Sequence, residues 1–312
     1  MINLRRKLLF TSVIFASVIG SQLVPHVTQA DTPVTYYVSV STGDDSYDGL
    51  STQTAFKSIQ RAADLSGPGD KIYVMNGTYY DWQSSSLLSI SHSGTPTAYI
   101  TFKAYPGHSP LLRPVNGAWN AISIHGAAYV NIEGFEIAGD TPNITLAQAQ
   151  ASHDAYKTQA INAKNPNFTS NCTITWNDYA KTNTNGIQIT TAPSVPSNPN
   201  SPPLIPQHIN IRNNKIHDMP GAGIAGLSGD YLTIENNLVY GTSKRTFFAT
   251  SGISLLKLTN WDTNTDTSFY KNYVRNNTVY DNRSEVGWAD KEIEKGLYTL
   301  PVRWQRDHYR LQ

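Results

Sequence analysis

Three stretches of the sequence repeat one motif: "IRNNKIHD" at 211–218, "IENNLVYG" at 234–241 and "VRNNTVYD" at 274–281. A weaker fourth copy, "IEGFEI", begins at Ile132. The first two copies begin 23 residues apart and the next two 40 residues apart. This spacing fits one coil of constant length followed by a coil that carries an inserted loop. Such self-similarity is typical of a solenoid, in which insertions leave from one face.

Each coil also contains a second short strand that opens with Gly-Ile, at Gly186, Gly223 and Gly252. These strands alternate aliphatic and polar residues, and no stretch between them has a convincing helical period. The pattern therefore predicts stacked coils of parallel strands. In such a stack the paired asparagines of the motif form ladders with a spacing of about 4.8 Å, and Asn tolerates the left-handed bends that the turns require.

The residues before the coils are predicted to cap the solenoid, because its open apolar end needs a cover. We place this cap at 31–70 and the coils at 71–294. The cap contains the strand "TYYVSV", a turn, and a short amphipathic helix whose apolar face is Phe56, Ile59, Ala62, Ala63 and Leu65. The acidic turn at 44–49 resembles a calcium loop, but Ala55 stands where such a loop needs a bidentate Glu, so we interpret it as an Asx-type turn.

Residues 1–30 have the features of a secretory signal peptide cleaved after Ala30: Arg5, Arg6 and Lys7 precede a short apolar run. Its removal would leave 21 basic and 23 acidic residues. We therefore expect a secreted, extracellular, bacterial protein that is monomeric, does not span a membrane and does not bind nucleic acid. Cys172 is the only cysteine, so no internal disulfide supports the fold.

The segment "YYVSVSTGDDSYDGLSTQTAFKSIQRAADLSGPGDKIYVMNGTYYD", followed by coils of the NN type, resembles the pectate-lyase-like superfamily, and within it polysaccharide lyases of family nine. The resemblance covers roughly 35–290 and implies an all-β, right-handed parallel β-helix. It also implies cleavage of an acidic, uronate-containing glycan by β-elimination. In that reaction a calcium ion held by Asp residues neutralises the sugar carboxylate, and a lysine removes the C5 proton.

The residues that could carry this chemistry are few. The family's acidic run corresponds here only to "NTNGIQIT" at 183–190, in which amides replace both carboxylates. Lys257 ends a Gly-Ile strand and is our candidate base; a solvated lysine at a strand end, the commoner situation, is the alternative. Asp230 and Asp262 are candidate calcium ligands, or simply turn residues.

Two aromatic residues, Trp261 and Tyr240, are candidates for stacking on sugar rings, although the tyrosine could equally pack between coils. Three function classes stay open: a polysaccharide lyase, which the resemblance favours, a glycoside hydrolase on the same scaffold, and a non-catalytic glycan-binding surface protein. A hydrolase would need two carboxylates about 5–9.5 Å apart, and no such pair can be selected from the sequence.

Two further segments depart from the repeat. The Pro-rich run at 192–206 cannot donate ladder hydrogen bonds and is predicted to be a surface loop. The tail 295–312 lacks a Gly-Ile strand. Shifted by one base, its codons permit "DGNGIIID", so we interpret the tail as the product of a frameshift or truncation near Lys295, which would leave the chain inactive; a genuine polar tail is the alternative.

Overall fold

The computed structural model describes residues 32–80, 85–114, 117–162, 176–194, 196–198 and 200–289, which all belong to one compact unit, Thr32–Gln312. The predicted signal peptide and the predicted aberrant tail lie outside the described residues. Within the described part of the chain, no helix is long and apolar enough to cross a membrane.

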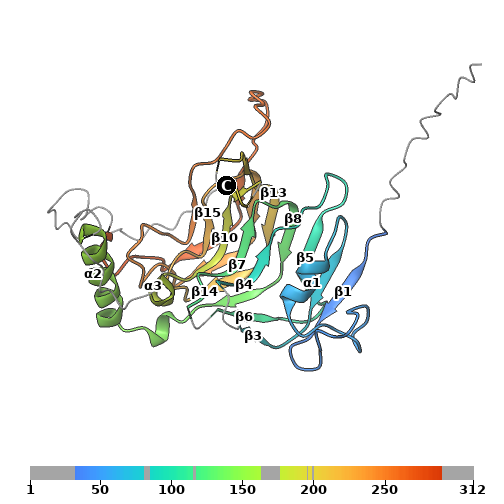
Figure 1. The fold of residues 1–312 in the computed structure, drawn as a ribbon, viewed down its shortest axis with the longest axis horizontal. Coiled ribbons are helices and arrows are strands. Elements are labelled where there is room, and N and C mark those ends of the chain that lie inside the picture. The colour runs from blue at the N-terminus through green and yellow to red at the C-terminus, as the bar shows by residue number, and fades with distance from the viewer. Residues whose placement is uncertain are drawn as a thin grey trace, which may run out of the picture. The chain divides into compact units, whose positions relative to one another are not determined.

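Three sheets of parallel strands form the body of the unit (Figure 1). Sheet A contains, in spatial order, β1 (Thr35–Val38), β2 (Lys71–Val74), β5 (Ile100–Ala104), β8 (Ala128–Glu133), β13 (Gln207–Arg212), β16 (Asp230–Glu235) and β19 (Tyr273–Arg275). Sheet B contains β3 (Thr78–Tyr80), β6 (Leu111–Arg113), β9 (Glu136–Ala138), β14 (Lys215–His217), β17 (Leu238–Tyr240) and β20 (Thr278–Tyr280). Sheet C contains β4 (Ser86–Ile90), β7 (Asn120–His125), β10 (Asn185–Thr190), β15 (Ile224–Gly226) and β18 (Ile253–Leu255).

The chain visits the sheets in the order C, A, B, so that each circuit is one coil and its strands pair with the same strands of the next coil. The repeat motif fixes this register, because Ile132, Ile211, Ile234 and Val274 pair in one column of sheet A. The first three are fully buried and the last is partly buried against the same core. The predicted inward column and the predicted parallel β-helix are therefore confirmed.

The second asparagine of each motif forms the predicted ladder. The Asn237 side chain accepts hydrogen bonds from Asn214 and donates to Asn277, at 3.1 and 3.0 Å between side-chain atoms. The first asparagine of each pair has a positive φ, for example 57° at Asn236, which is the left-handed bend expected for the turn. The ladder thus satisfies buried polar groups at each corner between sheets A and B.

The N-terminal segment contains the expected short helix, α1 (Ile59–Leu65), capped by the Ser58 hydroxyl. Three side chains of its predicted apolar face, Ile59, Ala62 and Ala63, join the solenoid core, whereas Leu65 is 43 % exposed because it ends the helix. The acidic turn is of the Asx type, since the Asp44 carboxylate accepts a hydrogen bond from the backbone N–H of Ser46 at 2.8 Å.

The structure corrects the expectation that the insertions lack helices. Between β9 and β10 lie the 3-10 helix η1 (Thr141–Asn143), α2 (Leu146–Asn162) and α3 (Trp176–Asn183). Buried side chains of this insertion pack with others from later turns in a second apolar cluster, which includes Ile144, Ala149, Tyr179, Phe247 and Val286. The Pro-rich segment also contains regular structure, an antiparallel pair of β11 (Ala192–Pro193) and β12 (Pro203–Leu204). Insertions therefore leave from both ends of the sheet C strands.

Candidate functional site: an inserted loop beside sheet A

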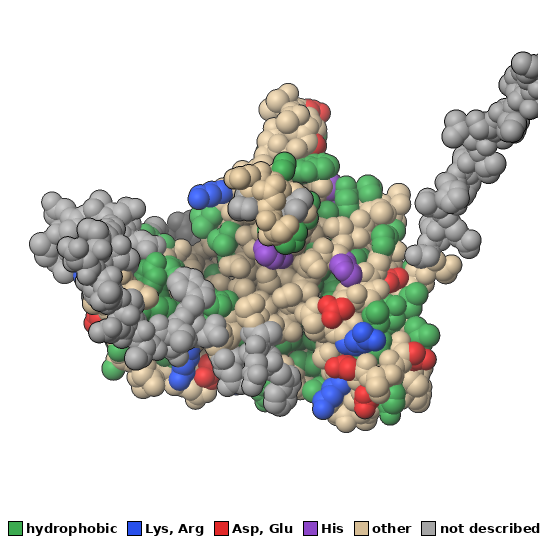
Figure 2. Space-filling model, in the orientation of Figure 1, with side chains coloured by type: hydrophobic (Ala, Val, Ile, Leu, Met, Phe, Trp, Pro, Cys, Tyr) green, Lys and Arg blue, Asp and Glu red, His purple; other side chains and the backbone are tan. Residues whose placement is uncertain are grey.

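The exposed face of sheet C carries no ionisable side chain among its described strand-centre positions. The inward residues of these strands belong to the core, so the residues between them point outward. These outward residues are Ser89, Ser123, Gln188, Ala225 and Ser254. The middle of the face in Figure 2 is accordingly almost free of charged side chains. Acid–base chemistry on this side of the molecule therefore has to come from the segments that flank sheet C.

The flanking segment with the richest chemistry is the inserted loop 256–272, which joins β18 to β19. Its first residues continue the coil, because the backbone N–H groups of Leu256 and Thr259 donate to carbonyls of the preceding coil. The loop then turns through three successive Asx turns, in which Asp262, Asn264 and Asp266 each accept a hydrogen bond from the N–H two residues on. Alternating Asx residues thus give this excursion a defined backbone.

This loop and the start of β16 surround an open hollow of about 440 Å³, which we call the loop hollow. Exposed aromatic side chains gather on the same loop: Trp261 is 43 % exposed, Phe269 40 % and Tyr270 78 %. The last two line the hollow together with polar residues such as Asn264, Asp266 and Lys271. Large aromatic side chains exposed beside polar groups in a concave surface are typical of a binding site.

The predicted calcium ligand Asp230 is the first residue of β16 and is only 1 % exposed. Its carboxylate accepts hydrogen bonds from the backbone N–H groups of Tyr231 at 2.9 Å and Trp261 at 3.0 Å, and from the Asn272 side chain at 3.3 Å. A buried carboxylate satisfied in this way anchors the inserted loop to the coil. The structure thus places Asp230 beside Trp261, as neighbours in one network.

The second predicted ligand, Asp262, lies in the loop and binds two groups. It accepts a hydrogen bond from the Tyr231 hydroxyl at 2.6 Å and forms an ion pair with Lys271. The Lys271 ammonium and the Tyr231 hydroxyl hold the pKa of Asp262 well below its usual range. Desolvation opposes the charge of Lys271, but its ion pairs with Asp262 and Asp230 outweigh this effect and raise the pKa of Lys271.

The two predicted ligands do not fit a calcium ion in this arrangement, because the Lys271 ammonium lies between their carboxylates. Among the residues that the structure describes, no group of three or more His, Cys, Asp and Glu side chains could hold a metal ion. Calcium binding therefore stays a prediction of the sequence resemblance.

The remaining predicted residues lie at two different places. Lys257 is exposed and follows β18 in the left-handed region, with φ of 49°, on the same loop as Trp261. Tyr240 lies on sheet B, where its ring stacks on His217 at 5.0 Å and on Tyr280 at 5.1 Å. Both faces of the Tyr240 ring are therefore covered, so its role in sugar stacking stays a prediction that would require one neighbour to move.

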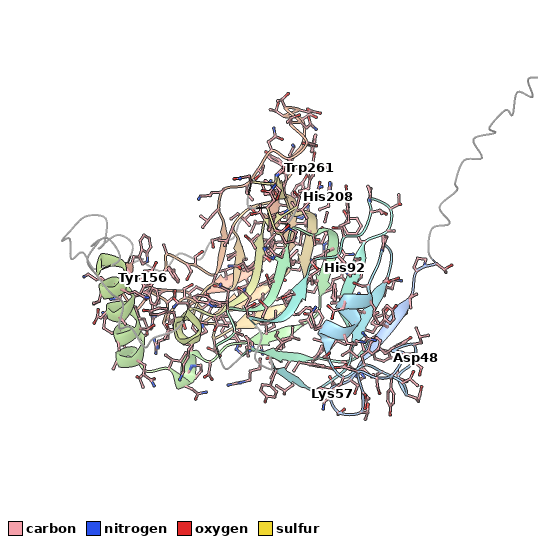
Figure 3. All side chains as sticks on the ribbon, in the orientation of Figure 1. Asp48, Lys57, His92, Tyr156, His208 and Trp261 are labelled. Atoms are coloured by element: carbon pink, nitrogen blue, oxygen red, sulfur yellow. The ribbon has the colours of Figure 1, made fainter. Side chains whose placement is uncertain are left out.

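An aromatic row that the sequence analysis missed borders the site. The row consists of the rings of Tyr129, His208 and Tyr231, near the N-terminal ends of β8, β13 and β16 in sheet A. Neighbouring rings stack with centroids 4.7 and 4.4 Å apart. All three residues have positive φ, which turns their side chains outward at the corner. Figure 3 shows His208 and Trp261 together at the top of the view, apart from Tyr156 on α2. Desolvation lowers the pKa of His208, so the neutral ring is favoured in this row.

The family described as "Right handed beta helix region" matches residues 117–296, which is more than half of the chain, and the protein belongs to this family. No curated protein matches the sequence.

Solved structures are similar to the chain at low sequence identity. Pectate lyase Pel9A is 16 % identical with a TM-score of 0.46, and the match covers 73 % of this chain and 45 % of that one. The GH136 lacto-N-biosidase from Eubacterium ramulus is 18 % identical with a TM-score of 0.41, over 67 % and 34 % of the two chains. The alginate lyase from Paenibacillus sp. str. FPU-7 is 16 % identical with a TM-score of 0.33, over 58 % and 41 %. This chain thus spans less than half the length of each of these proteins.

Proposed function

We propose that this protein binds a polysaccharide at the loop hollow and cleaves it by β-elimination. The observation that carries the binding part is the gathering of Trp261, Phe269 and Tyr270, all at least 40 % exposed, on one inserted loop, where Phe269 and Tyr270 line a concave surface with polar side chains. Sugars present apolar ring faces and many hydroxyls, so a site for them combines exposed aromatic rings with hydrogen-bonding side chains.

The β-elimination part rests on the sequence resemblance to lyases, which implies an acidic, uronate-containing polymer. In this reaction a base takes the C5 proton of the uronate, a C4–C5 double bond forms, and the C4–O bond to the leaving sugar breaks. The base must be a lysine that is free to give up its proton. Lys271 is unsuited to this role, because its ion pairs raise its pKa.

Lys257 is the better candidate for the base. It is exposed, it follows the end of a sheet C strand, and no described residue forms an ion pair with it. A hydrolase is less well supported, because the three carboxylates at or beside the hollow already accept other hydrogen bonds: Asp230 from the loop backbone, Asp262 from Tyr231 and Lys271, and Asp266 from the N–H of Ser268.

Incubation with a panel of uronate and neutral polysaccharides tests the proposal. We expect ultraviolet absorbance from unsaturated ends with a uronate polymer, its loss in Lys257→Met, and its retention in Lys57→Met, which alters an exposed lysine at the N-terminal end (Figure 3). New reducing ends without ultraviolet absorbance would indicate a hydrolase instead. Retardation in gels containing the polymer, without either product, would indicate a non-catalytic binding protein. An unretarded and inactive chain would contradict the proposal altogether.

A further inference from the structure

The Lys271 ammonium lies where three oxygen atoms converge. It contacts Oδ2 of Asp230 at 3.4 Å, Oδ1 of Asp262 and Oδ1 of Asn260. Only 14 % of the Lys271 side chain is exposed, and its ammonium lies 5.0 Å from the centre of the Tyr231 ring. Two carboxylates and an amide carbonyl around one positive charge are the oxygen ligands that calcium also uses in proteins.

These contacts join three segments that are separate along the chain. Asp230 belongs to the coil, where it is buried and accepts a hydrogen bond from the N–H of Tyr231. Asn260 and Asp262 belong to the outgoing part of the loop, and Lys271 to the returning part. The returning part is also tied to the coil by Asn272, whose Oδ1 accepts a hydrogen bond from the N–H of Leu232 at 2.9 Å. The ammonium is therefore the point at which both parts of the loop meet the coil.

We propose that Lys271 takes the place of a bound cation at this point and holds the loop hollow in shape without calcium. Removing the lysine would leave two carboxylates facing each other without a counter-charge, and the outgoing part of the loop would separate from the coil. Lys271 is thus a positioning residue for Trp261. Only this last role rests on the proposed polysaccharide binding.

Limited proteolysis with subtilisin, with cut sites mapped by mass spectrometry, tests the loop directly and does not depend on any glycan. We expect equal cleavage of the wild type with EDTA or with millimolar Ca²⁺. We expect Lys271→Met to be cut within 257–270 about tenfold faster, because local opening becomes easier. Lys244→Met is the matched control: this lysine is 17 % exposed and pairs with Asp281 at 2.6 Å, and neither residue lines the loop hollow. In Lys244→Met, the loop 256–272 should be cut at the wild-type rate.

Added calcium then tests the cation-site interpretation. In Lys271→Met, millimolar Ca²⁺ should restore protection, whereas in the double variant Lys271→Met/Asp230→Asn it should not. Faster cutting of the wild type in EDTA, or unchanged cutting of Lys271→Met, would overturn the proposal, and failure of calcium to restore protection would refute the cation-site interpretation. If the loop loosens but polymer retardation in gels is unchanged, the lysine holds the loop and the proposed polysaccharide site is wrong.

Discussion

Asn237→Ala probes the interaction that specifies the coil. The Asn237 side chain is 2 % exposed and accepts hydrogen bonds at Oδ1 from the backbone N–H of Asn214 at 3.0 Å and from its side chain at 3.1 Å. Its Nδ2 donates to the Ile211 carbonyl at 2.9 Å and to Oδ1 of Asn277 at 3.0 Å. Alanine removes all four bonds and leaves the buried N–H of Asn214 without an acceptor.

The cost follows from these contacts. A buried donor left unsatisfied, here the backbone N–H of Asn214, costs about 1–3 kcal/mol. The side-chain Nδ2 of Asn214 also loses one of its two acceptors. We therefore expect a loss of about 3 kcal/mol in the free energy of unfolding. Urea unfolding followed by circular dichroism measures it. Asn236→Gly is the control, because Asn236 is exposed with φ of 57° and glycine adopts this conformation freely. Equal unfolding midpoints for the two variants would refute the account of the ladder.

Two more predictions concern stability and the Pro-rich insertion. Burial raises the pKa of Tyr79 to about 12. Folding therefore favours the neutral phenol, and the stabilisation that is complete below about pH 10 falls by up to about 2.7 kcal/mol as the pH rises through 12. In urea unfolding between pH 9 and 12, Tyr79→Phe should lose less stability than the wild type. An equal dependence of stability on pH in the two proteins would contradict this. Proteolytic nicking within the Pro-rich loop at 192–206 should leave both fragments associated in gel filtration, because the coils on either side pair directly through β8, β13 and β16. Separation of the fragments would show instead that the loop supports the fold.

The repeat motif allowed the fold to be predicted because the residues of one short motif determine how a coil aligns with the next. Ile211 and Ile234 are each followed by the same pair of asparagines, and the two isoleucines pair with each other across β13 and β16 in sheet A. The helices of the insertion were missed for the opposite reason. The apolar side chains of α2 do not follow a helical period, and Ala149 is buried in a cluster with Phe247, far along the chain. Tertiary packing, which a local pattern does not contain, selects that helix.

The candidate site could be predicted in part. Asp230, Trp261 and Asp262 lie together because all three border the inserted loop that the 40-residue spacing had revealed. The partner of the two acids, Lys271, was missed because the path of a returning loop is not visible in sequence. The repeat contains a signal for this position. Lys271 stands three residues before Val274, just as Tyr231 stands three residues before Ile234. It therefore continues the aromatic row and lies over the Tyr231 ring.

The retardation of Trp261→Ala in gels containing the polymer that the wild type binds tests the central claim most directly. Tyr47→Ala is the control, because Tyr47 is 45 % exposed against 43 % for Trp261 and lies in the N-terminal turn. We expect Trp261→Ala to bind about tenfold more weakly, as loss of an exposed aromatic contact implies, with Tyr47→Ala unchanged. Equal retardation of Trp261→Ala and the wild type would contradict polysaccharide binding by the exposed aromatic side chains of the loop 256–272.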